Sequence, residues 1–215
     1  MFDICGDDKD MNDLVSNLLG KDSGQERNPI VISLVGMGGI GKTTLAQLAY
    51  NDHEVQAHFE EIMWVCVSDP FNQCRVAKEI IETVENRSPN IIELQSLLNR
   101  ICDLIKGKKF FLILDDVWID HKKWEPFKNA FKCGAQGSRI LITKRNEVAK
   151  IMGIAYTINL EVLSKEECWL MFSKIAFFGK DPKQCKQLED LGRQLANKCK
   201  GLPLAIKDFR GSHVL

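Results

Sequence analysis

The chain has 215 residues, 45% of them hydrophobic and 27% charged, a composition typical of a folded protein with its own core. Its 29 basic and 29 acidic residues give a formal net charge of zero, which argues against general binding to nucleic acids or membrane surfaces. No apolar run approaches the roughly 18 residues of a membrane span, so we expect neither a nucleic-acid partner nor a membrane span.

Apolar runs alternate with helical patterns along most of the chain. Residues 1–29 are polar apart from a short amphipathic stretch ending at Leu19. Beyond them, buried apolar runs predict strands, and the spacing of apolar residues between them predicts helices. The predicted strands are 30–35, 62–67, 110–114, 139–143 and 156–160, and the helices are 42–50, 76–84 and 91–105. This alternation favours an α/β fold, a mostly parallel sheet with helices on both faces and ligands at the carboxyl ends of its strands.

The pattern changes to helices alone after residue 160. Ser164 and Glu167 have the spacing of a capping box, and they open an apolar helix that runs to about residue 178. A second helix, 184–200, is closed by Gly201 and then Pro203. We therefore expect an α/β unit over residues 1–161 and a small helical subdomain over 162–215.

A glycine-rich motif, GMGGIGKT, follows the first strand and opens the first helix. It matches the P-loop pattern, in which backbone N–H groups and the helix N-terminus surround phosphate. In such a loop Lys42 reaches the β- and γ-phosphates, and the Thr43 hydroxyl ligates Mg²⁺. We predict that the chain binds ATP or ADP with Mg²⁺. The predicted phosphate-binding residues are Gly36, Gly38, Gly39, Gly41, Lys42, Thr43 and Thr44.

Two aspartates end the third predicted strand. Many strands end in Asp at a turn, but an apolar strand ending in Asp downstream of a P-loop has the Walker B pattern. We expect Asp115 to hold Mg²⁺ with Thr43, and Asp116 to orient or deprotonate an attacking water. Arg145 follows the fourth strand, where a cation either senses the γ-phosphate or belongs to a solvated basic turn.

The eight cysteines include no C-x-x-C pair, so we do not expect a zinc site. Several lie in apolar runs, such as Cys66, and we expect free buried thiols. The first residues have neither the basic nor the apolar region of a signal peptide. Together these features predict a reducing compartment, the cytoplasm.

Several segments, in this order, resemble the NB-ARC domain of plant disease-resistance proteins of the nucleotide-binding, leucine-rich-repeat class. The segments are GMGGIGKTT at 36–44, WVCVSD at 64–69, FLILDDVW at 111–118, GSRILITKR at 137–145, CWLMF at 168–172 and GLPLA at 201–205. The resemblance covers nearly the whole chain. Trp118, after the aspartates, resembles the coiled-coil subclass rather than the Toll/interleukin-receptor subclass.

The resemblance implies a molecular switch, held off with ADP and signalling with ATP, on a five-stranded parallel sheet with a first helical subdomain. It implies that Arg145 senses the γ-phosphate and that Pro203 packs on the nucleotide from the helical subdomain. It also implies that Ile4 and Cys5 lie near the adenine. The implied partners are the nucleotide and the other domains of a full-length receptor, the coiled coil and the leucine-rich repeats, which this chain does not contain.

The sequence departs from the family pattern in three places. Asp7 follows Gly6 where the family usually has Arg, and Lys144 replaces the second Thr of Thr-Thr-Arg. Residues 208–215 are short and polar where the family continues into an apolar helix, a winged-helix subdomain and repeats. These differences lead us to expect a fragment or a gene product with a disrupted end.

Three hypotheses about function remain open at the level of sequence. The leading one is an ADP/ATP-binding switch module of a plant immune receptor in the defence response. The second is a slow P-loop ATPase, slow because position 116 carries Asp rather than the longer Glu. The third is a fragment that binds nucleotide, if at all, without switching.

Overall fold

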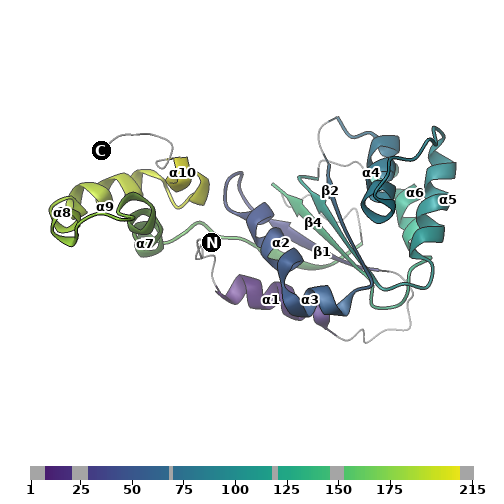
Figure 1. Cartoon of the computed structure of the whole chain (residues 1–215), viewed down its shortest axis with the longest axis horizontal. Coiled ribbons are helices and arrows are strands. Elements are labelled where there is room, and N and C mark those ends of the chain that lie inside the picture. The colour runs from purple at the N-terminus through teal and green to yellow at the C-terminus, as the bar shows by residue number, and fades with distance from the viewer. Residues whose placement is uncertain (1–7, 21–28, 68–69, 118–120, 146–152, 209–215) are drawn as a thin grey trace.

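Five parallel strands form the centre of the molecule, a computed structural model, in the order β2-β3-β4-β1-β5 (Figure 1). The structure describes residues 8–20, 29–67, 70–117, 121–145 and 153–208. The strands are β1 Ile30–Val35, β2 Glu61–Cys66, β3 Phe110–Asp115, β4 Arg139–Lys144 and β5 Ile154–Asn159. The first six helices are α1 Asp8–Leu19, α2 Lys42–Asn51, α3 His53–His58, α4 Gln73–Glu85, α5 Leu94–Ile105 and α6 His121–Phe131.

Alternate residues of each strand enter two hydrophobic clusters on opposite faces of the sheet. On β3, Leu112 and Leu114 join the cluster formed with α4, α5 and α6, whereas Phe111 and Ile113 join the one formed with α1, α2 and α3. Both faces of β3 and β4 are therefore covered, and every residue of the two strands is buried, with apolar residues through their centres and polar ones at their ends. The predicted α/β fold with helices on both faces is confirmed.

The register brings the ends of separate strands to one edge of the sheet. Val35 of β1 lies opposite Lys144 of β4 and Asn159 of β5, and Leu114 of β3 lies opposite Ile142 of β4. Residues that follow β1, β3 and β4 along the chain therefore meet at the carboxyl edge, where an open parallel sheet places its ligands.

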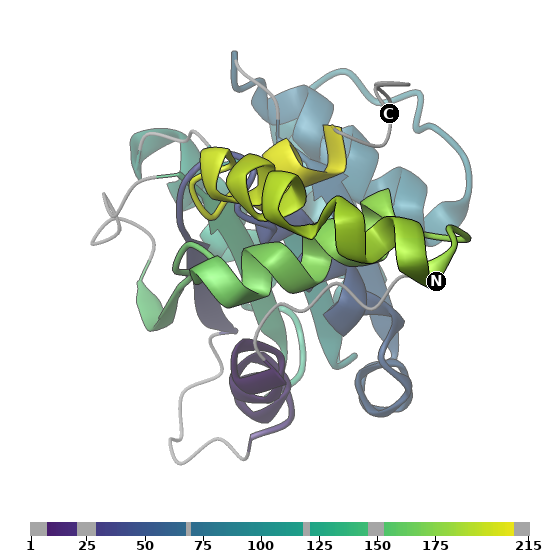
Figure 2. The same cartoon turned by 90° about the vertical axis from the view of Figure 1, so that its left-hand side faces the viewer.

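The remaining helices form a separate group beyond this edge of the sheet (Figure 1). They are α7 Lys165–Ala176, α8 Pro182–Gln187, α9 Glu189–Lys198 and α10 Pro203–Asp208. α7, α9 and α10 share a hydrophobic cluster of their own that includes Phe172 and Ile206. Figure 2 views the molecule from their side, and they lie across the front of the sheet.

Most predicted elements are confirmed within a few residues, including the capping box of Ser164 and Glu167 at the start of α7. The predicted helix 184–200 is wrong in one respect, because Leu188 separates α8 from α9. After this break α9 lies against α7, where a Cβ added at Gly192 would be 2.8 Å from the Trp169 ring. The break between α8 and α9 depends on packing against α7, which the spacing of apolar residues in the sequence does not reveal.

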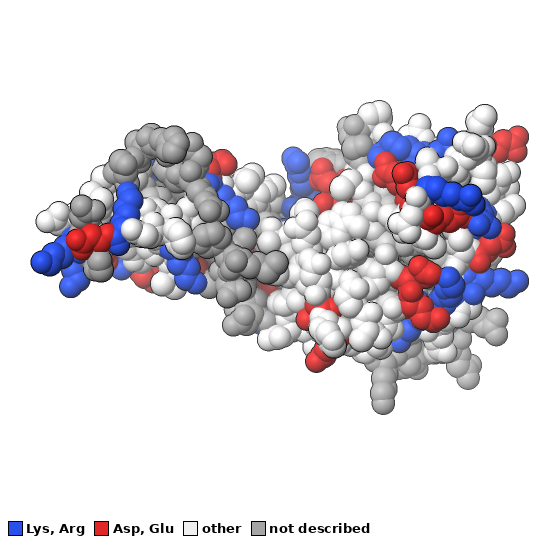
Figure 3. Space-filling model, in the orientation of Figure 1, with Lys and Arg blue, Asp and Glu red and all other residues white. Residues whose placement is uncertain are grey.

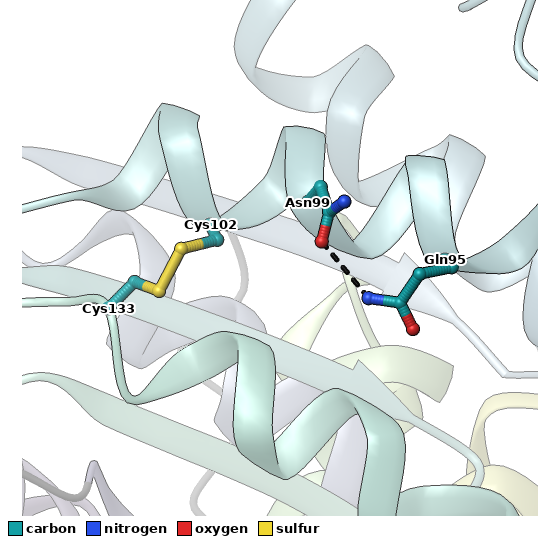
Figure 4. The surroundings of a disulfide bond; sticks show 4 residues. All are labelled: Gln95, Asn99, Cys102 and Cys133. Carbon is teal, nitrogen blue, oxygen red and sulfur yellow. Dashed lines mark hydrogen bonds between the residues drawn. A yellow bond between two sulfur atoms is a disulfide. The ribbon is translucent and has the colours of Figure 1, made fainter.

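The expectation of free thiols is wrong for two cysteines. Cys102 of α5 and Cys133, just after α6, form a disulfide with their Cα atoms 5.4 Å apart (Figure 4). They are separated by 31 residues in the sequence, so only the packing of α5 against α6 brings them together. Cys66 is free but exposed rather than buried, and Cys168 and Cys199 are buried free thiols as expected.

The visible surface in Figure 3 carries basic and acidic side chains close to one another, as a net charge of zero allows. None of the described helices is both long enough and apolar enough to cross a bilayer.

Candidate functional site

A cavity of about 680 Å³ lies at the carboxyl edge of the sheet, between the sheet and the helical group. The loop between β1 and α2, the ends of β3, β4 and β5, and parts of α1, α7 and α10 form its walls. Its polar lining comprises Lys9, Asp10, Lys42, Thr43, Thr44, Asp115, Asp116, Thr143, Arg145, Asn159, Glu161, Glu167 and Lys207. The cavity has the size of an ordinary small-molecule site.

The loop before α2 has a backbone that only glycine adopts readily. Gly39 has φ 79° and Gly41 has φ 110°, and Gly41 is the N-cap of α2. The ten-residue helix α2 begins at Lys42, and its first residues line the cavity. The positive end of its dipole and its unpaired first N–H groups therefore favour an anion there.

Lys42 is held at the base of this loop. It is 8% exposed, and its Nζ donates hydrogen bonds to the carbonyl oxygens of Gly36, at 2.7 Å, and Met37, at 2.8 Å. Burial lowers its pKa below the ordinary value, and the positive charge of Arg145 lowers it further, while Asp116 and Asp115 act in the opposite direction. An anion in the cavity would relieve the unfavourable part of this environment.

Asp115 ends β3 and is buried next to two hydroxyl groups. Its Oδ1 accepts hydrogen bonds from Thr43 Oγ1 at 3.0 Å and from Thr143 Oγ1 at 2.6 Å. The Thr43 hydroxyl and the Asp115 carboxylate are the hard oxygen ligands that Mg²⁺ prefers, and they adjoin the glycine-rich loop. The residues present therefore fit a Mg²⁺ ion bound together with a phosphate.

Asp116 and Arg145 face each other at the mouth of the site. The Arg145 Nε lies 3.8 Å from Asp116 Oδ1, and their side chains are 52% and 51% exposed. A pair this exposed contributes little to stability, so Arg145 can exchange its partner for another anion at small cost. An ideal Cβ at Gly38 would be 3.8 Å from the Arg145 guanidinium carbon, which shows how close this cation lies to the loop.

The helical group closes the cavity through α10. Pro203 is buried and lines the cavity, and the backbone N–H of Leu204 donates to the Gly39 carbonyl oxygen at 3.1 Å. The structure thus brings Pro203 to the same cavity as the glycine-rich loop. Ile4 and Cys5 lie outside the described residues, as does Trp118. Near the N-terminus, α1 contributes Lys9, Asp10 and Met11 to the lining.

Sequence reasoning missed Thr143 as a site residue, although it directly precedes Lys144 and Arg145. Only the pairing of β3 with β4 reveals its contact with Asp115, because the two residues are 28 positions apart in the sequence. The lining from α1 was also missed, because its polar sequence did not suggest a packed helix.

The sequence is similar to one known family over most of its length. The family model described as "NB-ARC domain" matches residues 7–182. The chain is 38% identical over 210 residues to the putative disease resistance protein RGA1 of Solanum bulbocastanum, covering 97% of this chain and 21% of that protein. It is 35% identical to the putative disease resistance RPP13-like protein 1 of Arabidopsis thaliana, covering 97% of this chain and 20% of that protein. The chain thus spans about a fifth of the length of these relatives.

Solved structures with the same fold include two archaeal proteins. One is a signal transduction ATPase with numerous domains (STAND) from Pyrococcus horikoshii, with a TM-score of 0.58 and 16% identity, covering 100% of this chain and 31% of that one. The other is Cdc6p from Pyrobaculum aerophilum, with a TM-score of 0.66 and 16% identity, covering 97% of this chain and 58% of that one. At this identity the similarity establishes the P-loop NTPase fold alone.

Proposed function

This chain belongs to the NB-ARC family, and we propose that it is the ADP- and ATP-binding switch module of a plant immune receptor. Such a module biases a longer protein toward a resting or a signalling state according to the nucleotide it holds. The family membership and the similarity to disease resistance proteins support the biological setting.

One observation carries the proposal: a single cavity is lined by groups suited to the phosphates and the cation of a magnesium nucleotide. Lys42 and the N-terminus of α2 face the position of phosphate, and Thr43 with Asp115 offers ligands for Mg²⁺. Arg145 lies beside the loop, where its positive charge could pair with the γ-phosphate that ATP has and ADP lacks. We assign phosphate contacts also to Gly36, Gly38, Gly39, Gly41 and Thr44.

When bound, Mg²⁺ neutralises phosphate charge and fixes the phosphate oxygens. In this proposal Lys42 leaves the carbonyl oxygens of its own loop and donates to phosphate oxygens instead. Arg145 leaves Asp116 and pairs with the γ-phosphate of ATP, which ADP lacks. The chain thereby distinguishes the two nucleotides by one contact, and a ligand shifts a conformational equilibrium only through such a differential interaction.

The helical group completes the proposed nucleotide site. We place the boundary between the nucleotide-binding unit and this helical subdomain at residues 161 and 162, and we assign Pro203 to the base or ribose side. Ile4 and Cys5 are assigned to the adenine side by the resemblance alone. We further propose that the coiled-coil and leucine-rich-repeat domains of a longer receptor are the partners of this module, and that it works in the cytoplasm.

Substituting Lys42→Ala tests the proposal directly. Loss of the charged hydrogen bonds should weaken binding of ADP and of ATP by about 2 kcal/mol, measured by titration calorimetry in the presence of Mg²⁺. Lys106→Ala is the matched control, because Lys106 is an exposed lysine at the end of α5. Equal affinities in the wild-type and Lys42→Ala proteins would show that the cavity does not hold nucleotide phosphate.

A slow ATPase is the second candidate function. It is favoured by Asp116, which lines the cavity and carries a carboxylate able to orient water. Multiple-turnover hydrolysis distinguishes the two functions: a slow ATPase should show continuous turnover, although far below the roughly 10 per second of a typical enzyme, whereas a module that only binds nucleotide should show none. A rate near that value would identify the chain as an enzyme first.

A further inference from the structure

Thr143, the last residue but one of β4, is hydrogen-bonded to three consecutive residues at the end of β3. Its hydroxyl donates to Asp115 Oδ1 at 2.6 Å and accepts from the Asp116 N–H at 2.8 Å, and its carbonyl oxygen accepts from the Val117 N–H at 2.8 Å. The side chain is 1% exposed, so it acts on its neighbours and not on solvent.

These bonds fix the carboxylate of Asp115. Its Oδ1 accepts from the hydroxyls of both Thr143 and Thr43, which come from different elements, β4 and α2. A carboxylate held through one oxygen by two donors has little freedom to rotate, and its Oδ2 takes no part in these two bonds. The pair of threonines thus presets the direction in which Asp115 offers an oxygen to a cation.

The same hydroxyl acts on Asp116. This residue has φ 54°, in the left-handed region that residues other than glycine adopt uncommonly. The hydrogen bond from its N–H to Thr143 Oγ1 ties it down in that conformation, which directs the Asp116 carboxylate toward Arg145. A hydroxyl is required because it must donate to one neighbour and accept from the next.

We propose that Thr143 is a positioning residue that couples Mg²⁺ to nucleotide binding, by orienting Asp115 for the cation and Asp116 for Arg145. This inference rests on the proposed function, because it requires a nucleotide bound with Mg²⁺. In this proposal Thr143 itself contacts neither the Mg²⁺ ion nor the nucleotide.

Ser33 provides a matched control on the neighbouring strand. It lies on β1 and pairs with Ile142, the residue that precedes Thr143 on β4. It is 0% exposed. Its Oγ has no hydrogen-bond partner among the described residues. Ser33→Ala therefore shows what happens when a buried hydroxyl of this sheet is removed without breaking a hydrogen bond to an aspartate.

The experiment measures the affinity for a fluorescent ADP with Mg²⁺ and with EDTA in the wild-type, Thr143→Val, Thr143→Ser and Ser33→Ala proteins. The ratio of the two affinities is the gain due to Mg²⁺. In Thr143→Val the ratio of the two affinities should fall about tenfold, because one charge-assisted hydrogen bond to Asp115 is lost. The affinity of this variant in EDTA should change by less than about threefold. Thr143→Ser and Ser33→Ala should retain the gain.

The inference is overturned if Thr143→Val keeps the wild-type gain, if Thr143→Ser loses as much as Thr143→Val, or if the loss is equally large in EDTA. If circular dichroism shows that Thr143→Val does not fold, Thr143→Ala replaces it and is read in the same way. A wild-type protein that binds ADP but gains nothing from Mg²⁺ also overturns it, and leaves nucleotide binding intact. Only a wild-type protein that binds no ADP at all removes the proposed function itself.

Discussion

Two cations, Lys42 and Arg145, face the same cavity and affect each other. The positive charge of Arg145 is the second cause, after burial, of the lowered pKa of Lys42. Two like charges and a helix N-terminus in one small volume repel one another, and Asp115 and Asp116 offset this repulsion only in part, since the pKa of Lys42 remains lowered. The residues that would bind phosphate therefore leave unfavourable charge interactions to be relieved by the ligand, as is common at functional sites.

Substituting Arg145→Ala should narrow the difference between the affinities for ATP and ADP. The guanidinium is more than half exposed and lies beside the loop, so it can reach a γ-phosphate, whereas ADP offers no group at that position. Titration of both nucleotides with Mg²⁺ measures the two affinities. Arg87→Ala removes the same charge from an exposed arginine outside the cavity and should change neither. If ATP and ADP lose affinity equally in Arg145→Ala, the side chain does not sense the γ-phosphate.

The disulfide links two secondary-structure elements, because it joins α5 to the segment after α6 (Figure 4). The segment that contains Cys133 lies against the start of β3, where a Cβ added at Gly134 would collide with the Phe110 ring, at the opposite end of the sheet from the cavity. There the Gly107 N–H after α5 also donates to the Cys133 carbonyl oxygen, at 3.1 Å. The crosslink therefore tightens the layer of α5 and α6 on the sheet, away from the residues proposed to bind nucleotide.

Reduction of this disulfide should lower the free energy of unfolding by up to about 4 kcal/mol, because a closed loop of this length restricts the unfolded chain. Urea denaturation with and without reductant measures the change. Cys102→Ser should remove the sensitivity to reductant, whereas Cys66→Ser, at an exposed free thiol, should keep it. Identical unfolding curves of the wild-type protein under both conditions would show that the crosslink does not form in solution.

Several helices have sequence features that explain why they were missed. α3 has only six residues, and its start depends on Asp52, whose side chain accepts from the N–H groups of Glu54 and Val55. α6 contains Pro126, which reads as a helix breaker in a sequence. Short or interrupted helices depend on tertiary packing for their stability, and their local patterns are weak.

The contact between α10 and the glycine-rich loop joins the two parts of the molecule. α10 starts at Pro203, and the N–H groups of a first helical turn have no partner within the helix. That of Leu204 is satisfied by the Gly39 carbonyl oxygen, and a Cβ added at Gly39 would lie 2.9 Å from the Leu204 Cβ. We therefore expect a rearrangement of the loop to disturb the packing of α10 against it.

Substituting Gly39→Ala should separate the helical group from the loop, because the added methyl group strains a positive φ by about 1–2 kcal/mol and also collides with Leu204. Hydrogen exchange of the Leu204 amide measures the contact and should become faster. Gly41→Ala imposes a similar strain at φ 110° with no atom within 4 Å of the added Cβ, so Leu204 should stay protected in that variant. Equal protection of Leu204 in both variants would contradict a coupling through this contact.

The sequence by itself determined the fold class and the position of the glycine-rich loop. Buried β-branched runs, helical spacing and the glycine pattern are local properties, so the strands and residues 36–44 could be assigned from neighbours along the chain. The sequence also predicted Asp115, Asp116 and Arg145 as site residues from their places just after predicted strands, and all three line the same cavity.

Tertiary structure alone decided which of these residues meet and what supports them. The order β2-β3-β4-β1-β5 places β4 between the strands that carry the loop and the aspartates, so that Thr143 contacts Asp115. The pairing of Cys102 with Cys133 and the docking of Leu204 on Gly39 likewise join residues far apart in the sequence. A local pattern records propensity and burial but carries no information about strand order, and contacts between distant elements depend on that order.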